Sequence, residues 1–211
     1  DDPSDGYEYY AIGWCHELMG DSDKALEWYD KGCDIDRSYA YLWVSRGDAL
    51  RAKGRIEEAK SDYEHVLEID DEARDGSCRH YALLGLGRED EAVEWIDKII
   101  ETAPNDAGCR YDKACLLARM GRTGDALKEL RTAFEKGFRR FAHLEHDNDM
   151  DPLRDLPEYK ALLKEYQGKP VEDQDIEPEI APEVAKAIVS EVQMKKMAGG
   201  TYEVPCSING L

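Results

Sequence analysis

Apolar and small residues recur along the first 140 residues with a helical period and with a longer period of 33 or 34 residues. Four glycines mark the longer period, and an alanine follows each of them five residues later. The pairs are Gly20 with Ala25, Gly54 with Ala59, Gly87 with Ala92, and Gly121 with Ala126. A fixed spacing of this length is typical of stacked helix-turn-helix units. We therefore expect each glycine to end a helix in a left-handed conformation and each alanine to let the next helix pack closely.

Placing each glycine at repeat position 15 gives repeats 6–39, 40–73, 73–106 and 107–140. Position 8 is mostly small and position 24 is large; the pairs are Gly13 with Tyr29, Gly47 with Tyr63, His80 with Ile96, and Ala114 with Leu130. The pattern resembles the tetratricopeptide repeat (TPR), and the resemblance covers about 140 of the 211 residues. His80 and Gly76 depart from it, since His80 is large for position 8 and Gly76 replaces an aromatic residue. The resemblance implies an all-α superhelix of helix-turn-helix repeats.

Residues outside the four repeats divide into further segments. Residues 1–5 are interpreted as the end of a preceding repeat, which would leave the first helix of the array exposed. Residues 141–166 resemble the helical closure of bacterial TPR arrays, with Pro157 in the first turn of the last helix and Leu162 and Leu163 covering repeat 4. Residues 167–181 hold five acidic residues, one lysine and two prolines, a composition that predicts an extended linker.

Residues 182–211 are expected to be the truncated start of a β domain. Apolar and polar positions alternate from Tyr202 to Ile208, and Asn209-Gly210 is a hairpin-turn signal. The segment GGTYEVPCSINGL resembles the entry strands of retropepsin-like aspartic proteases, but no Asp-Thr-Gly or Asp-Ser-Gly occurs in the sequence. An unrelated β domain or a tail hairpin is the other interpretation, and no catalytic residue is assigned.

The net charge and the apolar content of the chain limit the classes of partner that we expect. Lys and Arg number 28 and Asp and Glu number 47, which gives a net charge of −19. Nucleic-acid binding normally needs a basic face, so we expect no nucleic-acid partner. No apolar stretch approaches the roughly 20 residues of a membrane-spanning helix, so we expect no membrane partner. The N-terminus has no initiator Met and is interpreted as a cut, so the sequence assigns no compartment and a signal peptide stays possible.

Catalytic and metal-binding patterns are weak. Asp147, Asp149 and Asp151 imitate a calcium loop, but Pro152 stands where that loop needs glycine. His143 and His146 lack a third ligand for zinc. Six cysteines show no CxxC spacing and are expected to be reduced thiols in the helical core. We therefore expect no enzyme activity in this chain, no cofactor and no metal.

The first helices of the repeats hold the candidate binding residues. In TPR geometry, positions 2, 5, 6, 9, 12 and 13 face the concave groove. The residues selected there or beside it are Tyr7, Tyr10, Trp14, Tyr41, Arg51, Arg74, Tyr81, Tyr111 and Arg119. Tyrosine and tryptophan supply rigid contact area with a polar group, and the arginines could pair with carboxylates of a ligand. The alternative is that several of these rings pack between neighbouring helices.

These patterns favour a non-enzymatic scaffold that binds a protein or an extended peptide in an aromatic groove, as the N-terminal module of a larger protein. A second interpretation is a substrate-recruiting front end of a retropepsin-like aspartic protease whose catalytic domain is missing from this chain. A third is self-association through the exposed first helix or the 201–208 strand, because an unpaired strand edge is a template for pairing.

Overall fold

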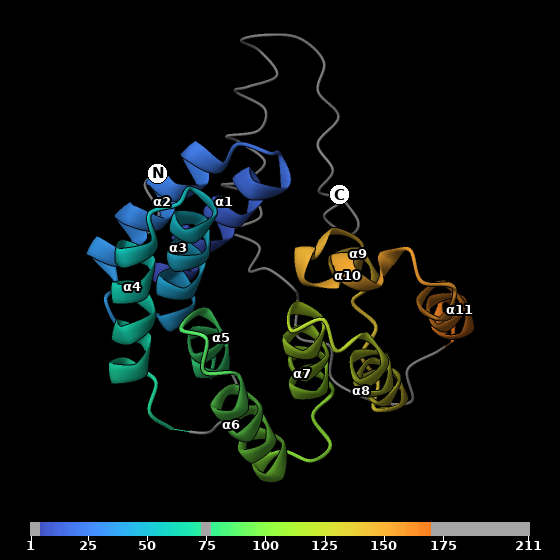
Figure 1. Ribbon diagram of the computed structural model, residues 1–211. Helices are drawn as coiled ribbons and strands as arrows, with labels where there is room; N and C mark the ends of the chain where they lie inside the picture. Colours follow the sequence, from blue (N-terminus) through green and yellow to red (C-terminus); the bar gives the residue numbers. More distant parts are fainter. Residues whose placement is uncertain (1–4, 73–76, 170–211) are drawn as a thin grey trace, which may run out of the picture. The chain divides into compact units, whose positions relative to one another are not determined.

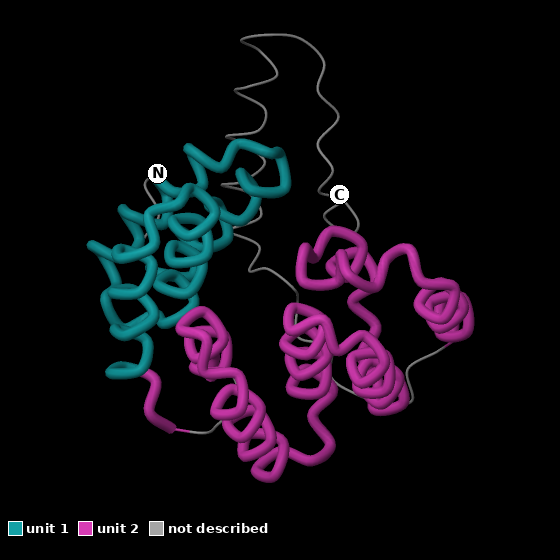
Figure 2. The backbone as a smooth tube through the Cα atoms, viewed as in Figure 1, with its two compact units in different colours: residues 1–69, 176–211 teal, residues 70–175 magenta. Residues whose placement is uncertain are grey.

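The computed structural model describes residues 5–72 and 77–169. These residues form eleven α-helices and one 3-10 helix, and no strand occurs among them (Figure 1). The chain divides into unit 1, residues 1–69 with 176–211, and unit 2, residues 70–175 (Figure 2). The β-hairpin-like tail expected in 182–211 lies outside the described residues, and so do residues 170–181 of the linker expected in 167–181.

Unit 1 contains two antiparallel helix pairs. The first pair is α1 (Gly6–Leu18) with α2 (Ser22–Ile35), and the second is α3 (Ala40–Ala52) with α4 (Ile56–Ile69). Gly20 and Gly54 separate the helices of each pair and have φ angles of 73° and 76°, which confirms the expected left-handed turns. Ala25 and Ala59 are buried, as close helix packing requires.

A glycine in the middle of each first helix is crossed by a tyrosine from the second helix. A Cβ built on Gly13 would lie 2.3 Å from Cε1 of Tyr29, and one built on Gly47 would lie 2.7 Å from Cε1 of Tyr63. Both tyrosine rings are buried. The helices of each pair therefore approach so closely that the position-8 residue cannot carry a side chain without displacing the ring.

A buried ion pair joins the second helix pair. Arg46 on α3 donates two hydrogen bonds to Asp62 on α4, at 2.8 Å from Nε and 2.6 Å from Nη2. Its guanidinium also lies 4.5 Å from the ring centroid of Trp43. The Asp62 side chain is only 5% exposed, so its charge depends on this arginine for compensation.

Unit 2 begins with a short helix, α5 (Arg79–Gly85), followed by α6 (Glu89–Thr102), α7 (Ala107–Arg119) and α8 (Thr123–Glu135). The late start of α5 has a local cause. The Asp70 carboxylate accepts hydrogen bonds from the backbone N–H of Cys78 at 2.7 Å and of Arg79 at 2.9 Å. It also accepts one from the Ser77 hydroxyl, at 3.0 Å. These bonds satisfy amide groups that a longer helix would otherwise pair internally.

Four short helices follow α8 in unit 2: α9 (Phe141–His146), η1 (Asn148–Met150), α10 (Asp151–Arg154) and α11 (Pro157–Tyr166). Helix α11 starts on Pro157, whose missing N–H costs nothing in a first turn, and it packs on α8. Leu162 is buried there. Leu163, which the sequence also predicted to cover repeat 4, is only half-buried.

The cysteines of the described residues behave as core residues. Cys15, Cys33, Cys78, Cys109 and Cys115 are all free and buried. Burial raises the pKa of the Cys33 thiol to about 12. This agrees with the expectation of reduced core thiols for these five, and Cys206 lies outside the described residues.

We expect His80 to make unit 2 sensitive to acid. The ring is fully buried on α5, and neither ring nitrogen has a hydrogen-bond partner. Burial, with a smaller effect of Arg119, lowers its pKa to about 3 from an ordinary 6.5. Only the unfolded chain takes up this proton between those values, so stability falls with pH from about 6.5 downward, by up to roughly 1.4 kcal/mol per pH unit.

We expect His80→Leu, which keeps the volume but cannot be protonated, to remove this acid sensitivity. Hydrogen exchange of the α5–α8 segments at pH 7.5 and pH 5 measures the effect. Equal loss of protection at pH 5 in the wild type and in His80→Leu would show that other groups cause the sensitivity.

Candidate functional site

The predicted groove residues fall into both units, and each unit is described by itself. Unit 1 carries Tyr7, Tyr10, Trp14, Tyr41 and Arg51, whereas Tyr81, Tyr111 and Arg119 belong to unit 2. Arg74 lies outside the described residues.

Three tyrosine rings gather where α1 meets the start of α3 in unit 1. The ring centroids of Tyr10, Tyr39 and Tyr41 lie 5.9–6.1 Å apart in every pairing. All three rings are half-buried, as are those of Tyr7 and Trp14. We call these five residues the aromatic surface. Tyr39 was not among the predicted residues; it lies one residue before α3, outside the helix positions that the repeat pattern examines.

Two carboxylates lie next to the aromatic surface. The buried Tyr29 hydroxyl lies beside Glu17 of α1. Its geometry toward Glu17 and the other described groups does not meet the full criteria of a hydrogen bond. The Tyr63 hydroxyl donates a 2.5 Å hydrogen bond to Asp48 of α3. Glu17 occupies repeat position 12 and Asp48 position 9, two of the groove positions named by the repeat geometry. The groove positions of the repeat therefore include two acids, which the predicted set of aromatic and basic residues did not contain.

The Glu17 carboxyl has an unusual proton affinity. Burial raises its pKa to about 7; the Tyr29 hydroxyl partly offsets this, and the Asp48 charge adds to it. Within the described part of unit 1, no cationic side chain forms an ion pair with Glu17. A carboxyl group with this pKa changes its charge near neutral pH, so the local charge of the aromatic surface depends on pH.

The predicted arginines are engaged with acids of the chain itself. Arg51 Nη2 lies 3.5 Å from Asp48 Oδ1, and Arg119 Nε lies 3.7 Å from Asp149 Oδ1. Arg119 also lies 5.5 Å from the ring centroid of Tyr81. These contacts weaken the expectation that the arginines pair with carboxylates of a ligand.

The two predicted tyrosines of unit 2 are buried. Tyr81 is 8% exposed and Tyr111 is 5% exposed. The Tyr111 ring stacks on Phe138 with centroids 4.2 Å apart, and its hydroxyl donates a hydrogen bond to Asp147. Both partners follow α8, so the segment that closes the array occupies the surface of Tyr111 that a ligand would use.

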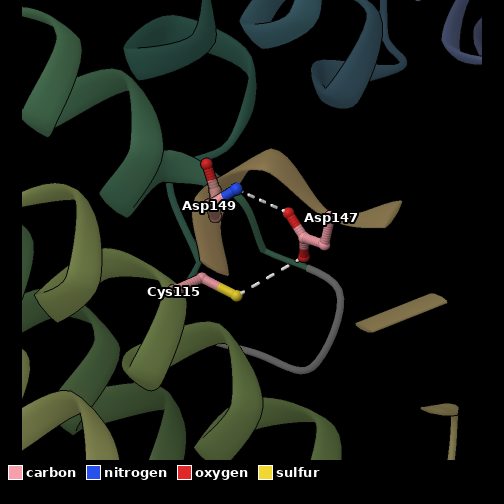
Figure 3. Close-up of side chains that lie close together, drawn as sticks. All are labelled: Cys115, Asp147 and Asp149. Atoms are coloured by element: carbon pink, nitrogen blue, oxygen red, sulfur yellow. Dashed lines mark hydrogen bonds between the residues drawn. The ribbon is translucent and has the colours of Figure 1, made fainter. Parts of the chain in front are cut away.

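One group of side chains in unit 2 has metal-ligand chemistry. The ligand atoms of Cys115, Asp147 and Asp149 lie within 4.8 Å of one another (Figure 3). The same atoms are explained by local structure, because Asp147 Oδ1 accepts the backbone N–H of Asp149 at 2.8 Å and caps η1. Burial, and next the charge of Asp147, raises the pKa of the Cys115 thiol, so the thiolate that a metal needs is disfavoured.

His143 and Tyr111 complete the surroundings of Asp147. Burial acts to raise the Asp147 pKa, but hydrogen bonds from His143 and Tyr111 outweigh it and hold that pKa below its ordinary value. His143 Nε2 lies 3.5 Å from Asp147 Oδ2. The carboxylate thus has partners within the chain, and the arrangement stabilises the turn between α9 and α10.

Comparison with known proteins places the repeats in a family. The model of the tetratricopeptide repeat matches residues 9–39 and 40–72, the two helix pairs of unit 1. The uncharacterized protein MJ0572 of Methanocaldococcus jannaschii is 34% identical over 62 residues, which cover 29% of this chain and 72% of that protein. Residues 9–72 are tetratricopeptide repeats. Repeats of this kind stack side by side and form extended binding surfaces.

Two further TPR relatives are longer than the matched region. The photosystem I assembly protein Ycf3 of Rippkaea orientalis is 34% identical over 76 residues, which cover 32% of this chain and 44% of that protein. Human DnaJ homolog subfamily C member 3 is 26% identical over 148 residues, covering 63% of this chain and 29% of that protein. The chain thus spans less than half the length of these two relatives.

Solved structures give the same likeness at low scores. The TPR protein YrrB, described as having an unusual peptide-binding site, matches with a TM-score of 0.35 and 20% identity, covering 74% of this chain and 90% of that one. MamA from Desulfovibrio magneticus RS-1, residues 41 to the end, matches with a TM-score of 0.35 and 14% identity, covering 93% of this chain and 97% of that one. Among residues 5–72 and 77–169, no helix has the length and apolar character needed to cross a membrane.

Proposed function

We propose that this TPR chain binds an extended peptide, or a peptide segment of a partner protein, on the aromatic surface of unit 1. The observation that supports the proposal is the cluster of Tyr10, Tyr39 and Tyr41, whose rings are close together but remain partly open to solvent. Aromatic side chains contribute much of the energy of protein interfaces, because they bury large rigid surfaces at low entropic cost.

Unit 2 contributes less to this proposal than the sequence suggested. Tyr81 and Tyr111 are buried, and Arg119 is engaged with Asp149 and the Tyr81 ring. We therefore place the binding energy on α1, on the start of α3 and on the loop before it.

We expect the double substitution Tyr10→Ala with Trp14→Ala to weaken peptide binding at least tenfold, since it removes two of the five rings. A randomised nonapeptide library selects the ligand, and fluorescence anisotropy measures its affinity for each variant. Ile35→Ala is the matched control, because it removes a large apolar side chain that is 61% exposed on α2, outside the aromatic surface. An unchanged affinity in the double variant would place the binding site elsewhere.

Two other proposals rest on residues outside the described part of the chain. The aspartic-protease alternative depends on the sequence pattern of residues 199–211, and sequence beyond Leu211 that lacks Asp-Thr-Gly or Asp-Ser-Gly would contradict it. Self-association through the 201–208 strand is tested by light scattering of the chain with and without residues 189–211. An equal subunit number in the two forms would contradict the strand-pairing proposal.

A further inference from the structure

The residue at position 8 of repeats 1 and 2 determines whether a tyrosine of the second helix can cross the first helix. Because Gly13 has no side chain, the Tyr29 ring crosses α1 at that point. Tyr10 and Glu17 lie one turn before and one turn after Gly13, and both act electrostatically on the Tyr29 hydroxyl. The Tyr29 side chain is fully buried, yet its hydroxyl has no hydrogen-bond partner in the described structure. It is aimed at the place where Glu17 lies.

The second repeat brings a similar arrangement to α3. The Tyr63 ring crosses at Gly47, and its hydroxyl meets Asp48, the next residue along the helix. Asp48 also acts on Glu17 and raises its pKa. Helices α1 and α3 pack together in unit 1. Each of the two helices thus carries an acid at a groove position with a tyrosine hydroxyl directed toward it: Tyr29 toward Glu17 and Tyr63 toward Asp48.

The ion pair between Asp48 and Arg51 is open to water. Arg51 lies 3.5 Å from Asp48, but its side chain is 46% exposed, and an ion pair this open to water is weak and easily exchanged. Glu17 forms no ion pair within the described part of unit 1, and its charged form is disfavoured by burial. A cationic group of a ligand would add a partner for the Asp48 charge and would favour the charged form of Glu17.

We propose that Tyr10, Glu17, Tyr29, Asp48 and Tyr63, which we call the cation site, bind one arginine or lysine side chain of the partner peptide. The carboxylates of Glu17 and Asp48 pair with the charge, and the buried Tyr29 and Tyr63 hydroxyls lie behind these two carboxylates. The face of Tyr10 attracts a cation by its ring quadrupole. The inference rests on the proposed function and deepens it by naming a basic peptide as the ligand.

Two observations favour a basic ligand over a neutral or acidic one. The aromatic surface is bordered by Glu17 and Asp48, so an acidic peptide would meet like charge. The chain as a whole carries a net charge of −19, which speeds the approach of cationic partners at low ionic strength. The corresponding places in repeats 3 and 4 hold Tyr81, Leu84, Cys115 and Ala118, so no acid stands there.

The first experiment uses the whole chain and defined probes. The ¹⁵N-labelled protein is titrated with Nα-acetyl-arginine amide and with Nα-acetyl-citrulline amide, a neutral molecule of nearly the same shape. We expect arginine to shift the amide signals of residues 10–17 and 45–48 and to bind at least fivefold more tightly than citrulline. Equal responses to both probes, or none, would overturn the proposal. This comparison needs no substituted protein.

Substitutions and pH then test the named carboxylates. We expect Glu17→Gln with Asp48→Asn to weaken arginine binding to the level of citrulline, whereas Glu27→Gln, an exposed acid on α2, leaves it unchanged. Because Glu17 loses its proton near neutral pH, binding to the wild type strengthens by up to about tenfold from pH 6 to pH 8. The groups that act on Glu17 are Tyr29 from α2 and Asp48 from α3.

Glu17→Gln alone should abolish the pH dependence. A pH dependence that persists in this variant would assign the titration to another group and remove Glu17 from the site. Library peptides that bind without a basic residue, together with a negative arginine titration, would leave the proposed function standing and overturn only the cation site. Arginine binding without any peptide binding would leave the cation site standing and contradict the proposed function.

Discussion

Gly13→Ala is expected to destabilise unit 1 by about 3 kcal/mol, near the upper end of the usual cost of overpacking. The added methyl group would lie 2.3 Å from a carbon of the Tyr29 ring, which is fully buried. Urea unfolding followed by tryptophan fluorescence measures the change, because three of the four tryptophans, Trp14, Trp28 and Trp43, belong to unit 1.

Two further variants test the cause. Gly124→Ala, at an open helical position where an added Cβ meets nothing within 4 Å, should be neutral or stabilising by up to about 1 kcal/mol. Gly13→Ala combined with Tyr29→Leu should cost less than the sum of the two single changes, because the smaller side chain vacates the contested space. Additive costs would show that the ring and the glycine do not interact.

Arg46→Met is expected to cost about 3 kcal/mol, because it leaves the Asp62 carboxylate buried without its bidentate partner. Methionine retains most of the apolar stem that packs near Trp43, so the loss reports mainly on the charge. The same urea unfolding experiment measures it.

The paired replacement Arg46→Met with Asp62→Leu should recover most of the lost stability, since neither charge is then buried. Arg55→Met removes an exposed arginine paired with Glu58 and should leave the unfolding midpoint unchanged. If Arg46→Met behaved like Arg55→Met, the Arg46–Asp62 pair would make no net contribution.

Much of the fold follows from the spacing of small residues. The left-handed turns at Gly20, Gly54, Gly87 and Gly121 were predictable because this backbone conformation strongly favours glycine. The start of α5 was not, because it depends on the Asp70 carboxylate, which lies nine residues before Arg79 and outside any helical period. The helical period of the sequence does not predict a hydrogen bond between a side chain and a backbone group nine residues later.

The candidate site was predicted less completely. Repeat positions selected Tyr10 and Tyr41, whose rings lie 5.9 Å apart in unit 1. They do not reveal which rings a following segment covers. Tyr111 is covered by Phe138, whose place depends on how the chain turns after α8. Glu17 was overlooked because an acid in an acidic chain is unremarkable until its burial is known.

The pairing of positions 8 and 24 has an evolutionary consequence. In repeats 1 and 2, glycine with tyrosine sends a hydroxyl from one side of the helix pair to the other; in repeats 3 and 4, His80 with Ile96 and Ala114 with Leu130 bring no hydroxyl across. Substitutions at the buried positions 8 and 24 can therefore change whether a hydroxyl group lies behind the groove residues of a repeat. A repeat can acquire a new ligand preference through its interior while its visible residues stay the same.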